Sequence, residues 1–127
     1  MVRCTHFVRR HDTWCGVVAI VHWSAPPPAE IYTATKGGMI SMVRGLAVGF
    51  ASYKVRAHAI LPEWIETDMT ERPTMNHKFR RNFMPRIPMR RWGAGDDFGG
   101  LAVYLMSAAS QYHTGDTFVA NGAYALL

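Results

Sequence analysis

Apolar residues recur every three or four positions between residues 30 and 53, a spacing typical of an amphipathic helix. The residues that follow it are Met39, Ile40, Met42, Val43, Leu46, Ala47 and Phe50. Because a helix has about 3.6 residues per turn, these side chains gather along one face. The pattern therefore predicts one long helix over Glu30–Tyr53. Its four glycines lower helix propensity but let another helix approach closely, within a subunit or between subunits.

Two short apolar runs flank this helix. Val17–Val21 and Val55–Leu61 are rich in β-branched and small apolar residues and lack polar alternation. Such runs are typical of strands buried on both faces of a parallel sheet. Strand, helix and strand form a βαβ unit, whose crossover is expected to be right-handed. The chain is therefore predicted to have an α/β fold.

The remaining segments give weaker signals. We expect the end of a helix at Thr5–His11, a turn over residues 12–16 and a loop at the prolines of residues 23–28. Thr67–Phe83 is predicted to form one or two short helices, since prolines interrupt anything longer. The acidic pair at 96–97 favours the start of a helix that runs to about Ala108. Thr117–Ala120 is predicted to be a short strand between two turns.

Tyr32 and Lys36 are the most informative polar pair. They stand four residues apart, which on a helix places the phenol and the ammonium on one face. A nearby ammonium favours the phenolate and so lowers the pKa of a tyrosine toward a value useful for proton transfer. Taken alone, this spacing is also that of an ordinary surface pair.

Three downstream segments change that interpretation. They are Val55–Met69 (VRAHAILPEWIETDM), Arg90–Gly93 (RRWG) and Thr114–Gly122 (TGDTFVANG). In this order and spacing, together with Tyr32 and Lys36, they resemble the C-terminal half of a short-chain dehydrogenase/reductase, from about Gly16 to Leu127. The resemblance implies a Rossmann-like three-layer fold and a single partial domain over residues 1–127. It also implies hydride transfer between NAD or NADP and a carbonyl or alcohol substrate.

The resemblance assigns roles to individual residues. Tyr32 would be the general acid/base, and Lys36 would modify its pKa and bind the cofactor ribose. Pro62, Ile65 and Thr67 match the loop that holds the nicotinamide carboxamide, with Ile65 contributing backbone and Thr67 its hydroxyl.

The chain departs from the family pattern at three points. The usual catalytic serine is replaced at the nearest position by His22, with Ser24 two residues later; either side chain can donate a hydrogen bond. Glu63 replaces a glycine beside the cofactor, which adds a charge and disfavours a positive φ. His58 stands where the family often has asparagine, and we expect it to be structural.

The family's first half, which carries the glycine-rich pyrophosphate turn, has no counterpart here. Gly93, Gly95 and Gly99 echo such a turn, but no strand precedes them. A second hypothesis is therefore an inactive, truncated remnant that only associates with other chains. In the family the helix corresponding to Glu30–Tyr53 pairs with its counterpart in a neighbouring subunit, so we expect a homo-oligomer. The segment from Met69 to Met89 would form the substrate lid.

Composition adds limits to these expectations. The 127 residues are 49% hydrophobic and 18% charged, typical of a soluble globular domain. No apolar run is long enough to span a bilayer, and the two cysteines indicate no disulfide scaffold, so we expect a cytoplasmic protein. The net charge is +5, and basic residues are concentrated between Lys78 and Arg91. We expect a solvated helix and loop beside a substrate pocket, which could suit an acidic substrate, rather than a nucleic-acid site, because no nucleic-acid-binding fold accompanies the charge. No histidine has convincing metal-ligand spacing, so no metal is expected.

Overall fold

The computed structural model describes residues 7–10, 13–16, 30–67, 70 and 77–126. Its helices and strands, in chain order, are β1 (Phe7–Arg10), β2 (Thr13–Gly16), α1 (Glu30–Phe50), β3 (Ala59–Pro62), α3 (His77–Phe83), α4 (Gly99–Met106) and β4 (Thr117–Ala120). Short 3-10 turns follow α1 at Ala51–Tyr53 and α3 at Met84–Arg86, precede α4 at Gly95–Phe98, and occur at Ala108–Ser110 and Tyr124–Leu126.

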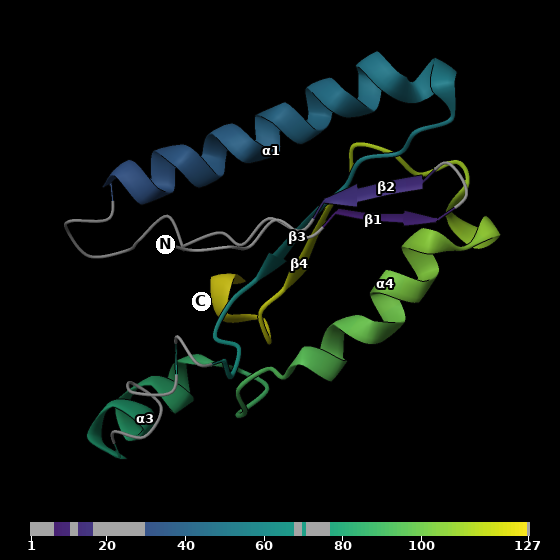
Figure 1. Cartoon of the computed structure of the whole chain (residues 1–127). Coiled ribbons are helices and arrows are strands. Elements are labelled where there is room, and N and C mark those ends of the chain that lie inside the picture. Colours follow the sequence, from purple (N-terminus) through teal and green to yellow (C-terminus); the bar gives the residue numbers. More distant parts are fainter. Residues whose placement is uncertain (1–6, 11–12, 17–29, 68–69, 71–76, 127) are drawn as a thin grey trace.

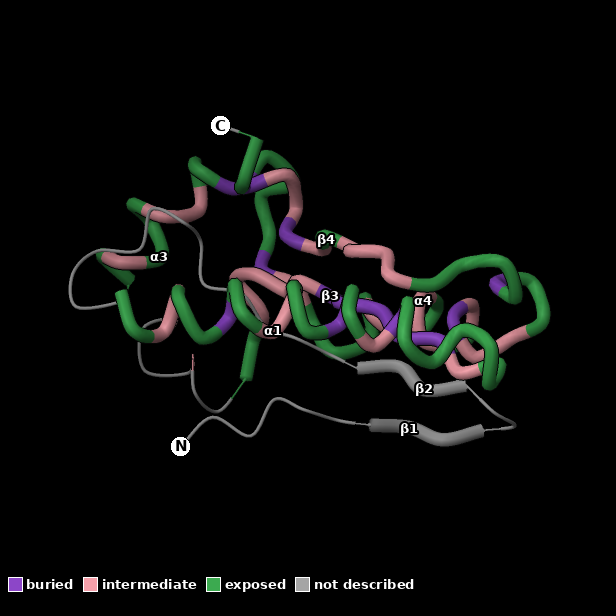
Figure 2. Tube along the Cα trace, turned by 90° about the horizontal axis from the view of Figure 1, so that it is seen from above, coloured by how far each residue is buried: buried purple, intermediate pink, exposed green. Residues whose placement is uncertain are grey.

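The centre of the molecule is the parallel pair formed by β3 and β4. Ala59 pairs with Thr117, and the register continues to Pro62 opposite Ala120. Figure 1 shows α1 on one side of this pair and α4 on the other, and the view from above places α1 across β3 (Figure 2). The predicted α/β, three-layer, Rossmann-like arrangement is therefore confirmed.

Successive residues of β3 point to the two helices in turn. Ala59 belongs to an apolar cluster with Val43 and Ala47 of α1, whereas Ile60 packs with Leu105 of α4. This alternation follows from the period of two along a strand. It explains why the β3 run is apolar throughout, since both of its faces are covered.

A buried arginine forms hydrogen bonds at the end of the sheet where β3 begins. The Arg56 guanidinium donates through Nη1 to the Ser110 carbonyl (2.5 Å) and hydroxyl (2.8 Å). Its Nη2 donates to the Leu105 carbonyl at 2.7 Å. These bonds join the chain entering β3 to the end of α4.

Several predicted elements are confirmed. The helix over Glu30–Tyr53 is found as α1 and its 3-10 continuation, the helix from residue 96 toward Ala108 as a 3-10 turn and α4, and the strand Thr117–Ala120 as β4. Within Thr67–Phe83, α3 begins at His77. The predicted strand Val17–Val21 lies outside the described residues.

Two predictions were wrong in their details. Residues 7–10 and 13–16 form an antiparallel hairpin, with Phe7 opposite Gly16, rather than a helix end and a turn. Pairing gives each strand backbone partners that a helix of one or two turns satisfies poorly. The strand predicted over Val55–Leu61 begins only at Ala59, because its partner β4 begins at Thr117, and it includes Pro62.

The direction of the elements defines one end of the molecule. The chain leaves α1, turns at residues 51–53 and returns along β3, so the start of α1 lies at the same end as the last residues of β3 and β4 (Figure 1). In open α/β sheets, ligands bind outside the carboxyl ends of the strands. The candidate site is therefore sought at this end.

Candidate active site

Tyr32 and Lys36 lie on one face of the first two turns of α1. The Lys36 ammonium sits over the Tyr32 ring, with Nζ 5.3 Å from the ring centroid. Lys36 is only 6% exposed, although most of α1 around it faces solvent. A cation held over an aromatic ring away from water is attracted more strongly than an exposed one. The predicted spacing thus brings the two groups together, and the tertiary structure buries the ammonium.

The loop after β3 turns at Trp64 rather than at Glu63. Trp64 has a φ of 56°, in the left-handed region, whereas Glu63 is not among the residues with positive φ. Glu63 therefore avoids the positive φ that it was expected to disfavour, and the next residue adopts it. The Glu63 carboxylate accepts a hydrogen bond from Asn121 Nδ2 at 3.2 Å, and the Glu63 amide donates to the Ala120 carbonyl at 3.3 Å.

Ile65 and Thr67 continue this loop in an ordered form. Ile65 forms an isolated parallel bridge with Gly93, made by the Trp64 carbonyl and the Glu66 amide. In such a bridge the N–H and C=O of the residue between them, here Ile65, point away from Gly93. The Ile65 carbonyl accepts from the Thr70 hydroxyl at 2.6 Å, and that hydroxyl also accepts from the Thr67 amide at 2.9 Å.

A cleft of about 210 Å³ lies beside the loop. Glu63, Trp64 and Ile65 line it together with residues that follow β4, including Asn121. At its edge the Arg91 guanidinium donates through both nitrogens to Asp97, at 2.7 Å each. These hydrogen bonds lower the pKa of Asp97 to about 2. The cleft therefore keeps a paired carboxylate and guanidinium at neutral pH.

An aromatic cluster fixes α3 against the same loop. The Trp64 ring lies 4.7 Å from that of Phe83 and 5.9 Å from that of Phe79 in α3. It also meets Trp92 edge-on at 5.1 Å and Tyr124 at 5.7 Å. Trp92 and Tyr124 are buried. Because one side chain contacts four rings, Trp64 couples the position of α3 to the end of the sheet.

The structure places the other predicted residues as follows. Pro62 is the last residue of β3, and Ile65 and Thr67 lie in the loop that follows. The end of β3 and the start of α1, the helix that carries Tyr32 and Lys36, lie at the same end of the molecule (Figure 1). His22 and Ser24 lie outside the described residues. His58 precedes β3 at the opposite end and is fully buried, with Nδ1 3.5 Å from Asp116 Oδ2, which agrees with a structural role.

Asn121 is a site residue that the sequence pattern marks only as part of a turn. It is buried and holds Glu63, and the Asn121-Gly122 dipeptide is the signal by which it was noticed. Gly122 has a φ of 59°, and a Cβ there would lie 2.9 Å from Ile87 Cγ2. Within the part of the chain that the structure describes, no group of three His, Cys, Asp or Glu side chains is arranged to hold a metal ion.

Comparison with known proteins identifies the origin of this arrangement. The family described as "Enoyl-(Acyl carrier protein) reductase" matches residues 16–125. The chain belongs to the short-chain dehydrogenase/reductase family. The resemblance inferred from its four motifs is thereby confirmed.

Individual relatives agree with this assignment. The chain is 31% identical over 119 residues to nodulation protein G of Rhizobium meliloti, covering 94% of this chain and 48% of the relative. It is 38% identical over 94 residues to acetoacetyl-CoA reductase of Synechocystis, covering 73% and 38%. The gluconate 5-dehydrogenase of Burkholderia cenocepacia, solved with NADP and tartrate, superposes with a TM-score of 0.82 at 27% identity, covering 91% and 45%.

The chain thus spans about half the length of the relatives that it matches. Among the described residues, no helix is both long and apolar enough to cross a membrane.

Proposed function

We propose that this chain carries the proton-transfer pair of an NAD(P)-dependent oxidoreductase acting on a carbonyl or alcohol substrate. The observation that carries the proposal is the buried Lys36 ammonium over the Tyr32 ring, at the end of the sheet where α/β proteins bind ligands. Relatives that are dehydrogenases and reductases support the reaction class, as does the NADP in the gluconate 5-dehydrogenase structure.

Tyr32 is proposed to exchange a proton with the substrate oxygen. An ammonium held beside a phenol favours the phenolate, which makes the hydroxyl a better proton donor and its conjugate base available near neutral pH. Lys36 is proposed to supply this charge from a buried position, where solvent screens it weakly. Burial of an ammonium costs free energy of folding, and a chain without a site would have no use for it. The buried Lys36 therefore favours this proposal over an inactive remnant.

The loop after β3 fits the amide end of a nicotinamide. When bound, the cofactor would donate or accept the hydride. The Ile65 amide is turned away from Gly93, and the Thr67 hydroxyl is exposed beside Thr70, 3.2 Å from the Thr70 hydroxyl. A carboxamide needs both a donor and an acceptor, and these groups offer both. Pro62 ends the strand and sets the start of this loop. His22 and Ser24 remain candidates for orienting the substrate oxygen.

The test is a pair of substitutions with matched controls. Tyr32→Phe removes only the hydroxyl, and Lys36→Met removes only the charge. Tyr53→Phe and Lys54→Met repeat both changes at exposed positions beyond the other end of α1, in its 3-10 turn and the residue that follows. Turnover is followed as reduced-nicotinamide absorbance with carbonyl substrates that include acetoacetyl-CoA and a keto-gluconate, and binding of nicotinamide mononucleotide is followed by NMR.

We expect Tyr32→Phe to lower kcat/KM by about 10²–10⁴-fold while the mononucleotide still binds. Lys36→Met is expected to weaken both turnover and mononucleotide binding, because Lys36 is proposed to modify the pKa of Tyr32 and to bind the cofactor ribose. The controls should match the unmodified chain. Unchanged turnover in Tyr32→Phe, or a wild-type chain that neither turns over these substrates nor binds the mononucleotide, contradicts the proposal.

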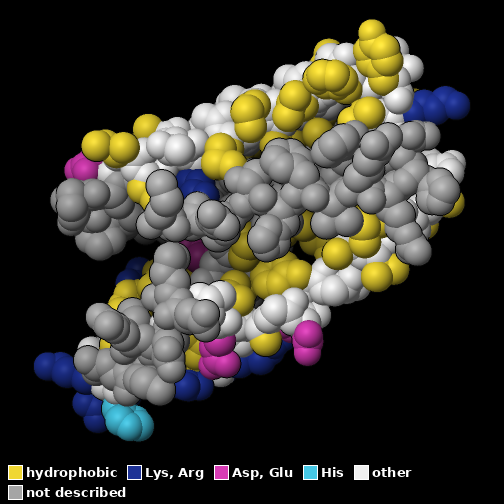
Figure 3. All heavy atoms as spheres, in the orientation of Figure 1, with side chains coloured by type: hydrophobic (Ala, Val, Ile, Leu, Met, Phe, Trp, Pro, Cys, Tyr) yellow, Lys and Arg dark blue, Asp and Glu magenta, His cyan; other side chains and the backbone are white. Residues whose placement is uncertain are grey.

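We also propose that the chain forms a homo-oligomer through α1. Its outward face exposes large apolar side chains, with Ile31 84%, Val48 83% and Met42 50% exposed. Figure 3 shows apolar side chains gathered along this helix. A Cβ added at Gly45 or Gly49 would meet nothing, so a second helix has room to approach. Sedimentation at about 50 μM should show dimers or larger species that Val48→Glu weakens, whereas a monomer in both cases rejects the idea.

A further inference from the structure

The positive charge of this protein comes from one stretch of sequence. Residues 72–95 hold seven of the fourteen Lys and Arg residues and none of the nine Asp and Glu residues. The rest of the chain therefore has seven cations against nine acids and is slightly acidic. A charge distribution so uneven produces a local positive potential that attracts anions to one face.

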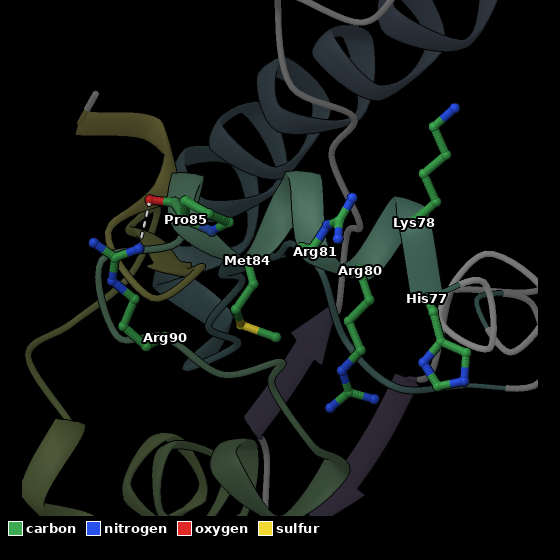
Figure 4. Close-up of a pocket in the computed structure, with 7 residues that line it drawn as sticks. All are labelled: His77, Lys78, Arg80, Arg81, Met84, Pro85 and Arg90. Atoms are coloured by element: carbon green, nitrogen blue, oxygen red, sulfur yellow. Dashed lines mark hydrogen bonds between the residues drawn. The ribbon is translucent and has the colours of Figure 1, made fainter.

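The structure gathers much of this stretch around one depression. Its volume is about 720 Å³, and it lies over α3 and the 3-10 turn that follows. Basic side chains cluster on this part of the surface (Figure 3). In Figure 4, Arg80 and His77 extend to the same side of α3 as Met84 and Arg90. Its lining includes His77, Arg80, Arg81, Met84, Pro85 and Arg90.

Contacts among the described residues neutralise little of the charge of Arg80 and Arg90, two of the arginines that line the depression. Arg80 Nη2 lies 3.9 Å from Glu66 Oε1, and both side chains are about half exposed. Such a pair contributes little and leaves the guanidinium able to bind another anion. Arg90 donates to the Pro85 carbonyl at 3.2 Å, which orients the side chain and cancels no charge.

The shape and lining of the depression favour a particular class of anion. It is an open depression rather than an enclosed pocket, and its volume far exceeds what one carboxylate needs. Arginine side chains bind phosphate oxygens bidentately. Met84 and Pro85 add apolar surface between the charges. A ligand with several phosphate groups and an apolar arm matches both features.

We propose that the α3 surface binds the phosphate groups of a coenzyme A carrier, so that the substrate is an acyl thioester. The inference rests on the proposed function, because it names the substrate class of that site. The aromatic contacts between Trp64 and α3 fix the basic surface at the end of the sheet that carries Tyr32 and Lys36. The depression and the reacting groups therefore lie at the same end of the molecule, which is where the arm of a bound carrier would have to reach.

The test uses adenosine 3′,5′-bisphosphate, which has the two phosphate esters on the carrier's ribose but lacks its outer phosphate, its arm and any reacting group. Binding to the full chain is measured by calorimetry at low and high salt. Arg80→Gln/Arg81→Gln removes two charges from the surface, and Arg44→Gln/Lys54→Gln removes two exposed charges from α1 and the residue after its 3-10 turn. Circular dichroism verifies that both double variants fold.

We expect the Arg80/Arg81 variant to bind the bisphosphate about tenfold or more weakly, and the control variant to bind it normally. Tyr32→Phe should also bind normally, which separates this result from failure of the catalytic proposal. Acetoacetyl-CoA should displace the probe.

Four outcomes overturn the proposal. They are no detectable binding, equal weakening in both double variants, gluconate or a polyglutamate peptide binding as tightly as the bisphosphate, and displacement by NADPH but not by acetoacetyl-CoA. The third would indicate a carboxylate or acidic-protein surface, and the fourth a cofactor site.

Discussion

Replacing Arg56 by methionine tests how the structure holds the sheet together. Methionine keeps most of the side-chain length and apolar contact but removes the guanidinium. The hydrogen bonds lost among the described residues include those to the Ser110 carbonyl, the Ser110 hydroxyl and the Leu105 carbonyl, all in a buried setting. Hydrogen bonds to a charged group contribute about 1.5–3 kcal/mol each, and they are not additive.

The remaining partners reduce this cost. The Ser110 carbonyl still accepts from the His113 amide at 3.0 Å, and the Leu105 carbonyl from the Ser110 hydroxyl at 3.1 Å. Neither carbonyl is left without a donor, so the full desolvation penalty does not apply. We therefore expect Arg56→Met to lower the free energy of unfolding by about 2–4 kcal/mol. This is a large share of the roughly 5–15 kcal/mol of a typical domain.

Urea unfolding followed by circular dichroism measures the effect, with two comparison variants. Arg44→Met removes an exposed arginine of α1 and should change stability by less than about 0.5 kcal/mol. Arg56→Lys keeps the charge but loses the planar guanidinium that donates from two nitrogens, so its loss of stability should be intermediate. If Arg56→Met were as stable as Arg44→Met, the hydrogen bonds of Arg56 to Ser110 and Leu105 would not stabilise the packing of β3 with α4.

Two further changes have definite expected outcomes. Burial lowers the pKa of His58 below 6.5, so the unfolded chain binds a proton there more readily than the folded chain does. The free energy of unfolding should therefore be at its full value above about pH 6.5 and should fall as the pH drops through the lowered pKa of the folded state. His58→Asn should flatten this slope in unfolding curves recorded between about pH 5 and 8, and an unchanged slope contradicts the assignment. Gly122→Ala should destabilise by about 1–3 kcal/mol, because φ is 59° and the new methyl group would lie 2.9 Å from Ile87 Cγ2. The matched change Gly45→Ala, on the open face of α1, should not destabilise, and equal melting temperatures for the two variants would exclude the steric reason.

The periodic parts of the sequence determined most of the architecture. The helical spacing in residues 30–53 and the apolar run after Val55 reflect which faces are buried, and burial is the strongest constraint on residue type. The strand at Thr117–Ala120 was marked by the turns on either side. The four-residue spacing of Tyr32 and Lys36 also sufficed to place both on one helix face, because helix geometry is local.

Other features depend on pairing between distant residues, which no local pattern records. The hairpin of β1 and β2 was mistaken for a helix end, since short segments take their structure from their partners. The start of β3 was decided by where β4 begins, more than fifty residues later. Glu63 was expected to disfavour a positive φ, but only the structure shows that Trp64 takes the positive φ and that Asn121 donates a hydrogen bond to the Glu63 carboxylate. The sequence determines which chemical groups are present at the site, such as the Tyr32 phenol and the Lys36 ammonium. Burial of that ammonium and the contact of α3 with Trp64 depend on the packing of segments that are far apart along the chain.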